Sequence, residues 1–218
     1  NGVIIIEDPS LLECIKKNSY DQFYNEHIYL FSALSIKILL KKFNLEMFDI
    51  KNLHTHGGSL RYYIKRKENK KISVSKNVKL QLKREINFGL NKLSIYQKFS
   101  KNAEKSKIKL LNILNKLKKE KKIVVGYGAT AKAVTVLNYC NINCDLIKNF
   151  IDTTPEKINR YMPGKNIKIL KYHNNILDKY HYVFLGAWNF KKEILNKEKR
   201  FLKRGGKYIT HVPMPKIF

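Results

Sequence analysis

Three side chains that exchange protons lie close together near the start of the chain: Tyr24, Glu26 and His27. A His beside a Glu and near a Tyr can share protons, and imidazole is well suited to general acid–base work near neutral pH. The same spacing also fits a surface loop whose His is satisfied by local hydrogen bonds. The segment is therefore a candidate proton-transfer site, and the alternative is a surface loop without a catalytic role.

A glycine fingerprint, Gly126-x-Gly128-x-x-Ala131, stands between a predicted strand and a predicted helix. The first Gly permits a tight turn, the second lets the backbone approach a phosphate, and Ala131 keeps the helix close to the strand. Lys132 adds a positive charge to the first helical turn, where anions already bind well. Asp152 follows the next predicted strand at a spacing that suits ribose hydroxyls. The pattern predicts a nucleotide site, and its alternative is a tight turn without a ligand.

Two other segments combine small residues with groups that bind ligands. The pair Gly57-Gly58 lies at the mouth of a predicted strand, where backbone can approach a ligand closely. Arg61, in the same segment, can make a bidentate contact with phosphate or carboxylate. Trp188 and Asn189 follow another strand, at an edge where α/β sheets bind ligands. A hairpin-like turn explains the first segment equally well, and a Trp that caps the core explains the second.

The amino-acid composition limits the kinds of function that the protein can have. The net charge of +27 suggests a nucleic-acid partner. Lys greatly outnumbers Arg, however, and is spread along the whole chain, so we predict no specific nucleic-acid role. No apolar run reaches the roughly 18–20 residues of a membrane span. Three unpaired cysteines indicate reduced thiols and a cytoplasmic protein, and we predict no metal site in the chain.

Hydrophobic periodicity divides the chain into strands and helices. We expect α/β architecture, with a Rossmann-like doubly wound parallel sheet in the C-terminal part. Residues 77–121 read as Lys-rich helices that break at Gly89 or between Ser100 and Ala103. The expected strands are 3–7, 45–53, 59–65, 123–125, 146–151, 167–170, 182–185 and 207–212, and the other expected helices are 10–18, 32–43, 129–140 and 191–203.

Taken in order along the chain, these segments resemble one family. They are Tyr24-Asn25-Glu26-His27, Thr55-His56-Gly57-Gly58-Ser59-Leu60-Arg61, Gly126-Tyr127-Gly128-Ala129-Thr130-Ala131-Lys132, Leu137-Asn138-Tyr139-Cys140, Met162-Pro163-Gly164 and Trp188-Asn189. The set resembles the S-adenosylmethionine-dependent sugar C-methyltransferases, which act on nucleotide-linked keto-deoxysugars. The resemblance covers nearly the whole chain.

The resemblance implies three domain assignments. Residues 1–76 would be the C-terminal part of a class I methyltransferase domain, namely its last strands and helices. Residues 77–121 would be a helical connection, and residues 122–218 the Rossmann-like C-terminal domain. The chain opens on Asn1 without an initiator Met and runs at once into a predicted strand, so we expect a fragment of a longer protein. The motif for S-adenosylmethionine and a zinc-binding domain would then lie upstream.

The resemblance also assigns roles. The catalytic residues would be Tyr24, Glu26 and His27, with His27 or Tyr24 as the base that removes a proton α to the sugar ketone and Glu26 orienting it. The family usually has His at the position of Asn25. Residues that would face a dTDP-type nucleotide-sugar are His56, Gly57, Gly58, Ser59, Arg61, Gly126, Tyr127, Gly128, Lys132, Trp188 and Asn189. Under this reading Asp152 no longer needs to bind ribose.

Two other functions remain as alternatives. One is an NAD- or nucleotide-binding Rossmann module without methyl transfer, and the other is a basic protein that binds nucleic acid or an anionic surface. The sequence leaves open the sugar, the carbon, the nucleotide and the oligomeric state.

Overall fold

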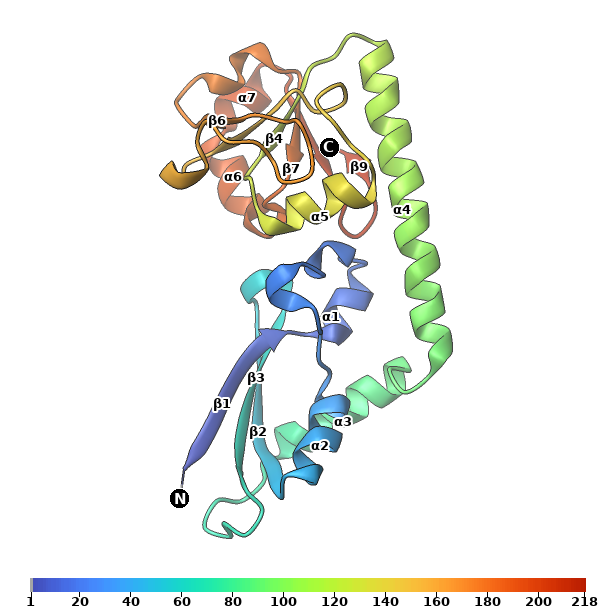
Figure 1. Ribbon diagram of the computed structural model, residues 1–218, viewed down its shortest axis with the longest axis vertical. Coiled ribbons are helices and arrows are strands. Elements are labelled where there is room, and N and C mark those ends of the chain that lie inside the picture. Colours follow the sequence, from blue (N-terminus) through green and yellow to red (C-terminus); the bar gives the residue numbers. More distant parts are fainter. Residues whose placement is uncertain (1) are drawn as a thin grey trace. The chain divides into compact units, whose positions relative to one another are not determined.

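The computed structural model describes residues 2–218 and divides into two compact units (Figure 1). Unit 1 comprises Asn1–Ser19 and His27–Lys101. Unit 2 comprises Tyr20–Glu26 and Asn102–Phe218. The short segment Tyr20–Glu26, which we call the strap, therefore belongs to unit 2 although the chain on both sides of it belongs to unit 1.

Unit 1 contains a three-stranded antiparallel sheet in the order β1-β3-β2. Its strands are β1 (Val3–Pro9), β2 (Leu45–Leu53) and β3 (Ser59–Arg66), and each overlaps a strand that the sequence predicted. Helices α2 (Ala33–Lys42) and α3 (Lys76–Phe88) pack against β2. Helix α2 begins with a capping box in which Ser32 and Ser35 satisfy each other's backbone N–H groups. The buried core of the unit includes Ile36, Leu40, Met47, Ile50, Leu60, Tyr62, Ile64 and Val78.

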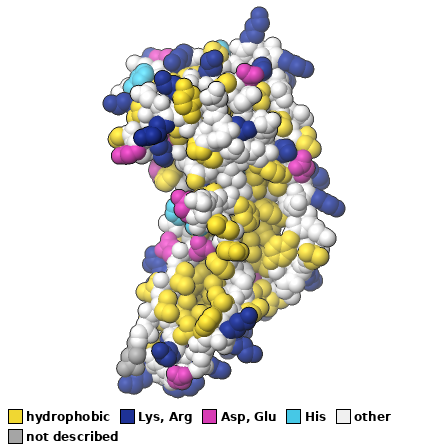
Figure 2. Space-filling model, viewed as in Figure 1, with side chains coloured by type: hydrophobic (Ala, Val, Ile, Leu, Met, Phe, Trp, Pro, Cys, Tyr) yellow, Lys and Arg dark blue, Asp and Glu magenta, His cyan; other side chains and the backbone are white. Residues whose placement is uncertain are grey.

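Strand β1 exposes apolar side chains on both of its faces. Val3, Ile4, Ile5 and Ile6 are each 39–59% exposed, and β1 lies at the edge of its sheet. Figure 2 shows hydrophobic side chains gathered over the part of the molecule that unit 1 forms. A continuous apolar strand is typical of a sheet that is covered on both faces, and an open strand edge can pair with further chain. Unit 1 therefore presents an edge suited to additional protein.

The Lys-rich region forms two helices that part at one glycine. Helix α3 ends at Gly89, whose φ of +95° is the left-handed conformation that glycine adopts without strain. Helix α4 (Leu93–Lys119) then runs without interruption. The second predicted break, at Ser100–Ala103, is wrong, because Ala103 lies on the buried face of α4 and continues its apolar stripe.

Unit 2 contains a six-stranded mixed sheet in the order β6-β5-β4-β7-β8-β9. All neighbouring strands are parallel except the last pair, because β9 runs antiparallel to β8. The architecture is therefore α/β, but the sheet is not purely parallel as predicted. The strands are β4 (Val124–Tyr127), β5 (Asn149–Asp152), β6 (Ile169–Lys171), β7 (Tyr182–Leu185), β8 (Lys207–Thr210) and β9 (Lys216–Ile217).

Short helical elements complete the two units. The single helix predicted at 191–203 is two helices in the structure. The remaining elements of the chain are α1 (Leu11–Lys16), α5 (Ala131–Tyr139), α6 (Lys191–Lys197), α7 (Lys199–Lys203), and the 3-10 turns η1 (Tyr20–Gln22), η2 (Asn25–His27), η3 (Thr55–Gly57), η4 (Pro155–Lys157), η5 (Ile176–Lys179) and η6 (Trp188–Phe190).

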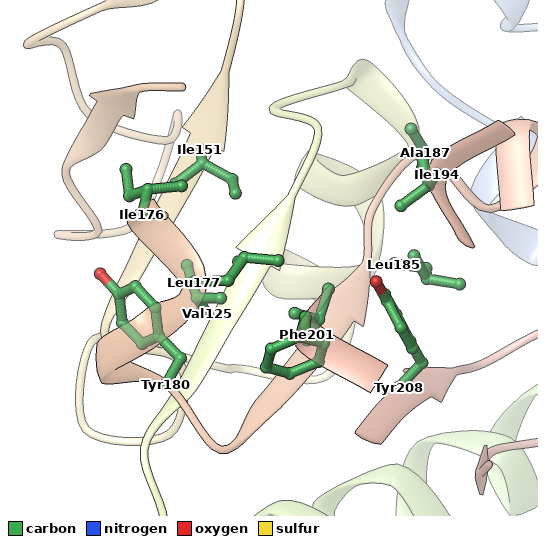
Figure 3. Packing of buried hydrophobic residues seen from close by; sticks show 11 residues of the cluster. Val125, Ile151, Ile176, Leu177, Tyr180, Leu185, Ala187, Ile194, Phe201 and Tyr208 are labelled. Atoms are coloured by element: carbon green, nitrogen blue, oxygen red, sulfur yellow. The ribbon is translucent and has the colours of Figure 1, made fainter. Parts of the chain in front are cut away.

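A buried apolar cluster supports the sheet of unit 2 (Figure 3). Val125, Val183 and Leu185 come from the central strands β4 and β7, and Phe201 and Tyr208 pack beside them with ring centroids 5.4 Å apart. Alternate residues of a strand point to opposite faces, so these central strands place one set of side chains in this cluster. The cluster fixes the strand ends that carry the glycine loop. Within residues 2–218, no helix has both the length and the apolar character that a membrane crossing requires.

Candidate active site

The strap carries two of the three predicted acid–base residues into unit 2. Its first three residues, Tyr20, Asp21 and Gln22, are buried. Further along, the carbonyl of Phe23 accepts a hydrogen bond of 3.1 Å from the hydroxyl of Thr135 on α5. These contacts place Tyr24 and Glu26 beside α5.

Tyr24 and Glu26 line a cavity of about 690 Å³ within unit 2. The strap forms one wall, α5 and the residues before it form the second, and the segment 157–163 forms the third. Two cations, Lys157 and Arg160, and the ring of Tyr161 belong to the third wall. Pockets for small ligands typically measure 300–1,000 Å³, so the cavity is large enough for a nucleotide.

His27 belongs to unit 1, where its Nδ1 lies 3.3 Å from Oδ1 of Asp8 at the end of β1. Burial raises the pKa of Asp8, and the neighbouring His27 offsets this only in part. A carboxylate in this position can fix the orientation of an imidazole ring. Sequence reasoning missed Asp8, which lies near the end of β1.

The glycine segment of unit 1 is occupied by contacts within the chain. A Cβ at Gly58 would lie 2.9 Å from the side chain of Glu13, and Lys17 donates a hydrogen bond to the carbonyl of Gly57. Arg61 donates two hydrogen bonds, of 2.7 and 3.0 Å, to Glu7. Of the other predicted binding residues here, the hydroxyl of Ser59 donates to the carbonyl of Thr55, and His56 is exposed with a φ of +52°.

The glycine fingerprint of unit 2 is likewise filled by neighbouring side chains. A Cβ at Gly126 would lie 2.3 Å from the ring of Phe150, and a Cβ at Gly128 would lie 2.6 Å from Cβ of Ala187. Asp152 accepts a hydrogen bond of 2.7 Å from the N–H of Ala129 within the loop. Packing within the chain therefore accounts for both glycines and for the acid, without a dinucleotide.

Four other predicted binding residues lie around this loop. Tyr127 donates a hydrogen bond of 2.9 Å to Glu198, and Trp188 donates one of 2.6 Å from its indole N–H to Asp21. Lys132 is buried, with its ammonium 5.1 Å from the centre of the Trp188 ring, and Asn189 is half-buried in η6. Tyr127 and Gly128 line a second cavity of about 370 Å³, which also contains Asp152. Within unit 2, the predicted residues therefore divide between two cavities, with Tyr24 and Glu26 in one and Tyr127 and Gly128 in the other.

Asn138 is a site residue that the sequence did not single out as a ligand. Its side-chain N–H₂ donates to the carbonyls of Val134 and Pro163. A Cβ at Gly164, whose φ is +71°, would lie 2.4 Å from Oδ1 of Asn138. Asn138 thus holds the Met162-Pro163-Gly164 turn against α5 and shapes the third wall of the 690 Å³ cavity.

No group of three or more His, Cys, Asp or Glu side chains able to hold a metal occurs within residues 2–218. The three cysteines are free thiols. Burial raises the pKa of Cys140 to about 11, so this thiol is a packed side chain rather than a nucleophile at neutral pH.

Asp152 supplies a first testable prediction. Burial acts to raise its pKa, but hydrogen bonds from Thr154 and Ala129 outweigh burial and lower it below the ordinary value of 3.8. A lowered pKa stabilises the native state above pH 3.8, and this contribution is lost as pH falls through the native pKa. We expect Asp152→Asn to reduce the free energy of unfolding at pH 7 by about 1–3 kcal/mol.

The difference between wild type and Asp152→Asn should shrink as the pH falls below 3.8, and urea unfolding at several pH values measures it. Asp145→Asn is the matched control, because the Asp145 side chain is 62% exposed and should change stability little. A difference that stayed constant down to low pH would contradict the proposed role of the carboxylate.

Comparison with known proteins decides the family. Residues 54–213 match the sequence model of a family described as the C-methyltransferase C-terminal domain. The chain belongs to this family. The matched span of the C-methyltransferase domain begins just before His56 and includes the glycine fingerprint and Trp188, whereas the strap precedes it.

In a second comparison, the region of similarity to a known protein also includes the strap. The chain is 29% identical over 217 residues to the C-methyltransferase NovU of Streptomyces niveus, and this alignment covers the whole chain. The alignment covers 51% of NovU, so the chain spans about half the length of the curated relative that it matches.

Proposed function

We propose that this chain is the C-terminal half of an S-adenosylmethionine-dependent C-methyltransferase that methylates the carbon α to the ketone of a nucleotide-linked deoxysugar. Membership of the C-methyltransferase C-terminal domain family and the similarity to NovU support methyl transfer. The observation that carries the proposal is the cavity of about 690 Å³ in unit 2, because its lining combines Tyr24 and Glu26 with two cations.

The acceptor carbon must lose a proton before it can form a new bond to carbon. In the proposed reaction, His27 or Tyr24 takes the proton α to the ketone, and Glu26 orients the base. Asp8, whose Oδ1 lies 3.3 Å from Nδ1 of His27, orients the imidazole ring. The enolate that forms is then the carbon nucleophile.

The nucleotide part of the substrate fits the third wall of the cavity. Arg160 donates one hydrogen bond of 2.7 Å from Nε to the carbonyl of Glu156. A guanidinium carries five N–H donors, so this bond orients the group and leaves donors for a diphosphate. Lys157 adds a second cation, and the exposed ring of Tyr161 offers a surface on which a base can stack.

S-adenosylmethionine supplies an electrophilic methyl group. The described residues of unit 1 do not fit this donor, because their glycine turn packs on Glu13 and binds Lys17. We therefore place the donor site in an upstream half that pairs with β1. Two observations support such a half: the chain matches 51% of NovU, and β1 is an uncovered apolar edge. The zinc-binding domain that the resemblance implies would belong to the same half.

The alternative of an NAD-binding module is not favoured. In that reading, Gly128 would lie against a pyrophosphate and Asp152 would bind ribose. Instead, Ala187 occupies the space beside Gly128, and the carboxylate of Asp152 binds the N–H of Ala129.

Arg160→Gln tests the proposed diphosphate contact. We expect KM for the nucleotide-sugar to rise about 10-fold or more with little change in kcat, because a charge-assisted hydrogen bond contributes about 1.5–3 kcal/mol to binding. Steady-state kinetics measure both constants. They require the intact protein, by which we mean this chain together with the upstream half proposed above. Lys148→Gln is the control, since it removes an equal charge from unit 2 outside this cavity. An equal rise in KM for both variants would mean that overall charge, not Arg160, binds the phosphates.

The function itself is tested by incubating the intact protein with S-adenosylmethionine that carries a labelled methyl group and a panel of nucleotide-linked keto-deoxysugars. We expect the label on the carbon α to the ketone, and mass spectrometry and NMR of the product locate it. Label on oxygen or nitrogen, or no transfer to any member of a broad panel, would contradict the proposal.

A further inference from the structure

Two side chains from distant parts of unit 2 meet at Asp21 of the strap. The indole N–H of Trp188 donates to Oδ2 of Asp21 over 2.6 Å, and Nε2 of His211 lies 3.2 Å from the same oxygen. Asp21 and His211 are both completely buried. A buried carboxylate is costly unless hydrogen bonds or an opposite charge satisfy it, so this cluster constrains the segments that contribute to it.

The rings around the cluster are closely packed. His211 stacks on Phe184 of β7 with centroids 5.8 Å apart, and Tyr20 meets the His211 ring edge-on at 5.7 Å. The ammonium of Lys132 lies 5.1 Å from the centre of the Trp188 ring. Asp21 therefore lies in a well-ordered part of unit 2, at the ends of strands β7 and β8.

The strap is short, and the chain enters and leaves it from unit 1. Its regular structure is confined to a 3-10 turn at Tyr20–Gln22 and part of the turn Asn25–His27. Such a segment has little local structure to hold its shape, so its position depends on contacts with unit 2. The bond from Trp188 to Asp21 ties its buried end, three residues before Tyr24.

We propose that Asp21 is a positioning residue that holds the strap on unit 2 through the hydrogen bond from Trp188, with the ring of His211 packed beside it, and so fixes Tyr24 and Glu26 in the wall of the cavity. The catalytic consequence rests on the proposed function, whereas the anchoring of the strap does not. Trp188 acts in this account by binding Asp21 and not by stacking on the substrate.

Trp188→Phe is the decisive variant, because it keeps an aromatic ring and removes the N–H donor together with part of the indole. Hydrogen exchange of the ligand-free chain, followed by mass spectrometry, reports the strap directly. We expect the amides of residues 22–26 to exchange about 10-fold faster or more, as the loss of one hydrogen bond to a charged group implies. The amides of β4 should keep their wild-type rates.

In the intact protein, Trp188→Phe should lower kcat with little change in KM for the nucleotide-sugar. Asp21→Ala should lower kcat at least as much, and adding Trp188→Phe to it should have little further effect, because both residues act through one contact. Tyr180→Phe is the matched control. It removes another buried aromatic donor of unit 2, which bonds to Asn149 over 3.3 Å, and it should leave the strap amides and kcat unchanged.

The two parts of the account can fail separately. Strap amides that exchange at wild-type rates in Trp188→Phe, or that respond equally to Tyr180→Phe, would overturn the anchoring proposal even in an active methyltransferase. Faster exchange confined to the strap would support it even if the intact protein transferred no methyl group, and in that case only the proposed function would fail.

Discussion

Replacing His27 with Ala in the intact protein is expected to lower kcat by about 10²–10⁴-fold, the range that one general base contributes. His27 lies next to Glu26 in the sequence, and Asp8 lies 3.3 Å from its Nδ1. A carboxylate so placed orients the imidazole ring for proton transfer. Binding of the nucleotide-sugar should change little, because the cavity in unit 2 that we assign to it is built without His27.

The kinetic test compares His27→Ala with His173→Ala, which removes an exposed imidazole from unit 2. Turnover and nucleotide-sugar affinity are measured for both variants. Unchanged turnover in His27→Ala would refute the assignment of the base and would leave Tyr24 as the candidate. A loss of affinity as large as the loss of turnover would instead show that His27 binds substrate.

Gly126→Ala should destabilise unit 2 by about 1–3 kcal/mol or more, because the added methyl group overpacks a filled core. Its Cβ would lie 2.3–2.5 Å from three ring atoms of Phe150, and this ring is itself completely buried. Real Cβ atoms do not approach other atoms so closely, so strand β4 or the ring must shift. The free energy of unfolding, measured in urea, reports the cost.

A second substitution shows whether the ring is the cause. Phe150→Leu replaces the ring with a smaller aliphatic side chain, so in the double variant the new methyl group gains space. We expect the double variant to be less destabilised than the sum of the two single variants, since residues in contact are not additive. Additive costs would show that Gly126 is required for another reason, such as close approach of a ligand.

Much of the secondary structure could be predicted because it is encoded locally. Strand β2, for example, was predicted with its observed ends. Other features depend on tertiary contacts. The break at Ser100–Ala103 was predicted from local composition, but burial of Ala103 keeps α4 continuous. Strand β9 has only two residues and pairs antiparallel with β8, so no periodicity could reveal it.

In the candidate site, too, some features are encoded locally in the sequence and others depend on tertiary contacts. Sequence spacing singled out Tyr24 and Glu26, and both line one cavity. Sequence spacing could not reveal that Trp188 bonds to Asp21, 167 positions away, or that Asp8 approaches His27. The glycine fingerprint has the spacing of a phosphate loop, yet Phe150 and Ala187 explain its glycines. Such partners come from distant strands, and only the fold brings them together.

Calorimetric titration of this chain with dTDP and with NAD, in moderate salt, tests the central claim most directly. Salt is needed because a net charge of +27 attracts any anion non-specifically. We predict saturable binding of dTDP that Arg160→Gln weakens, and no binding of NAD. Binding of NAD without binding of dTDP would contradict the account and would make unit 2 a dinucleotide module.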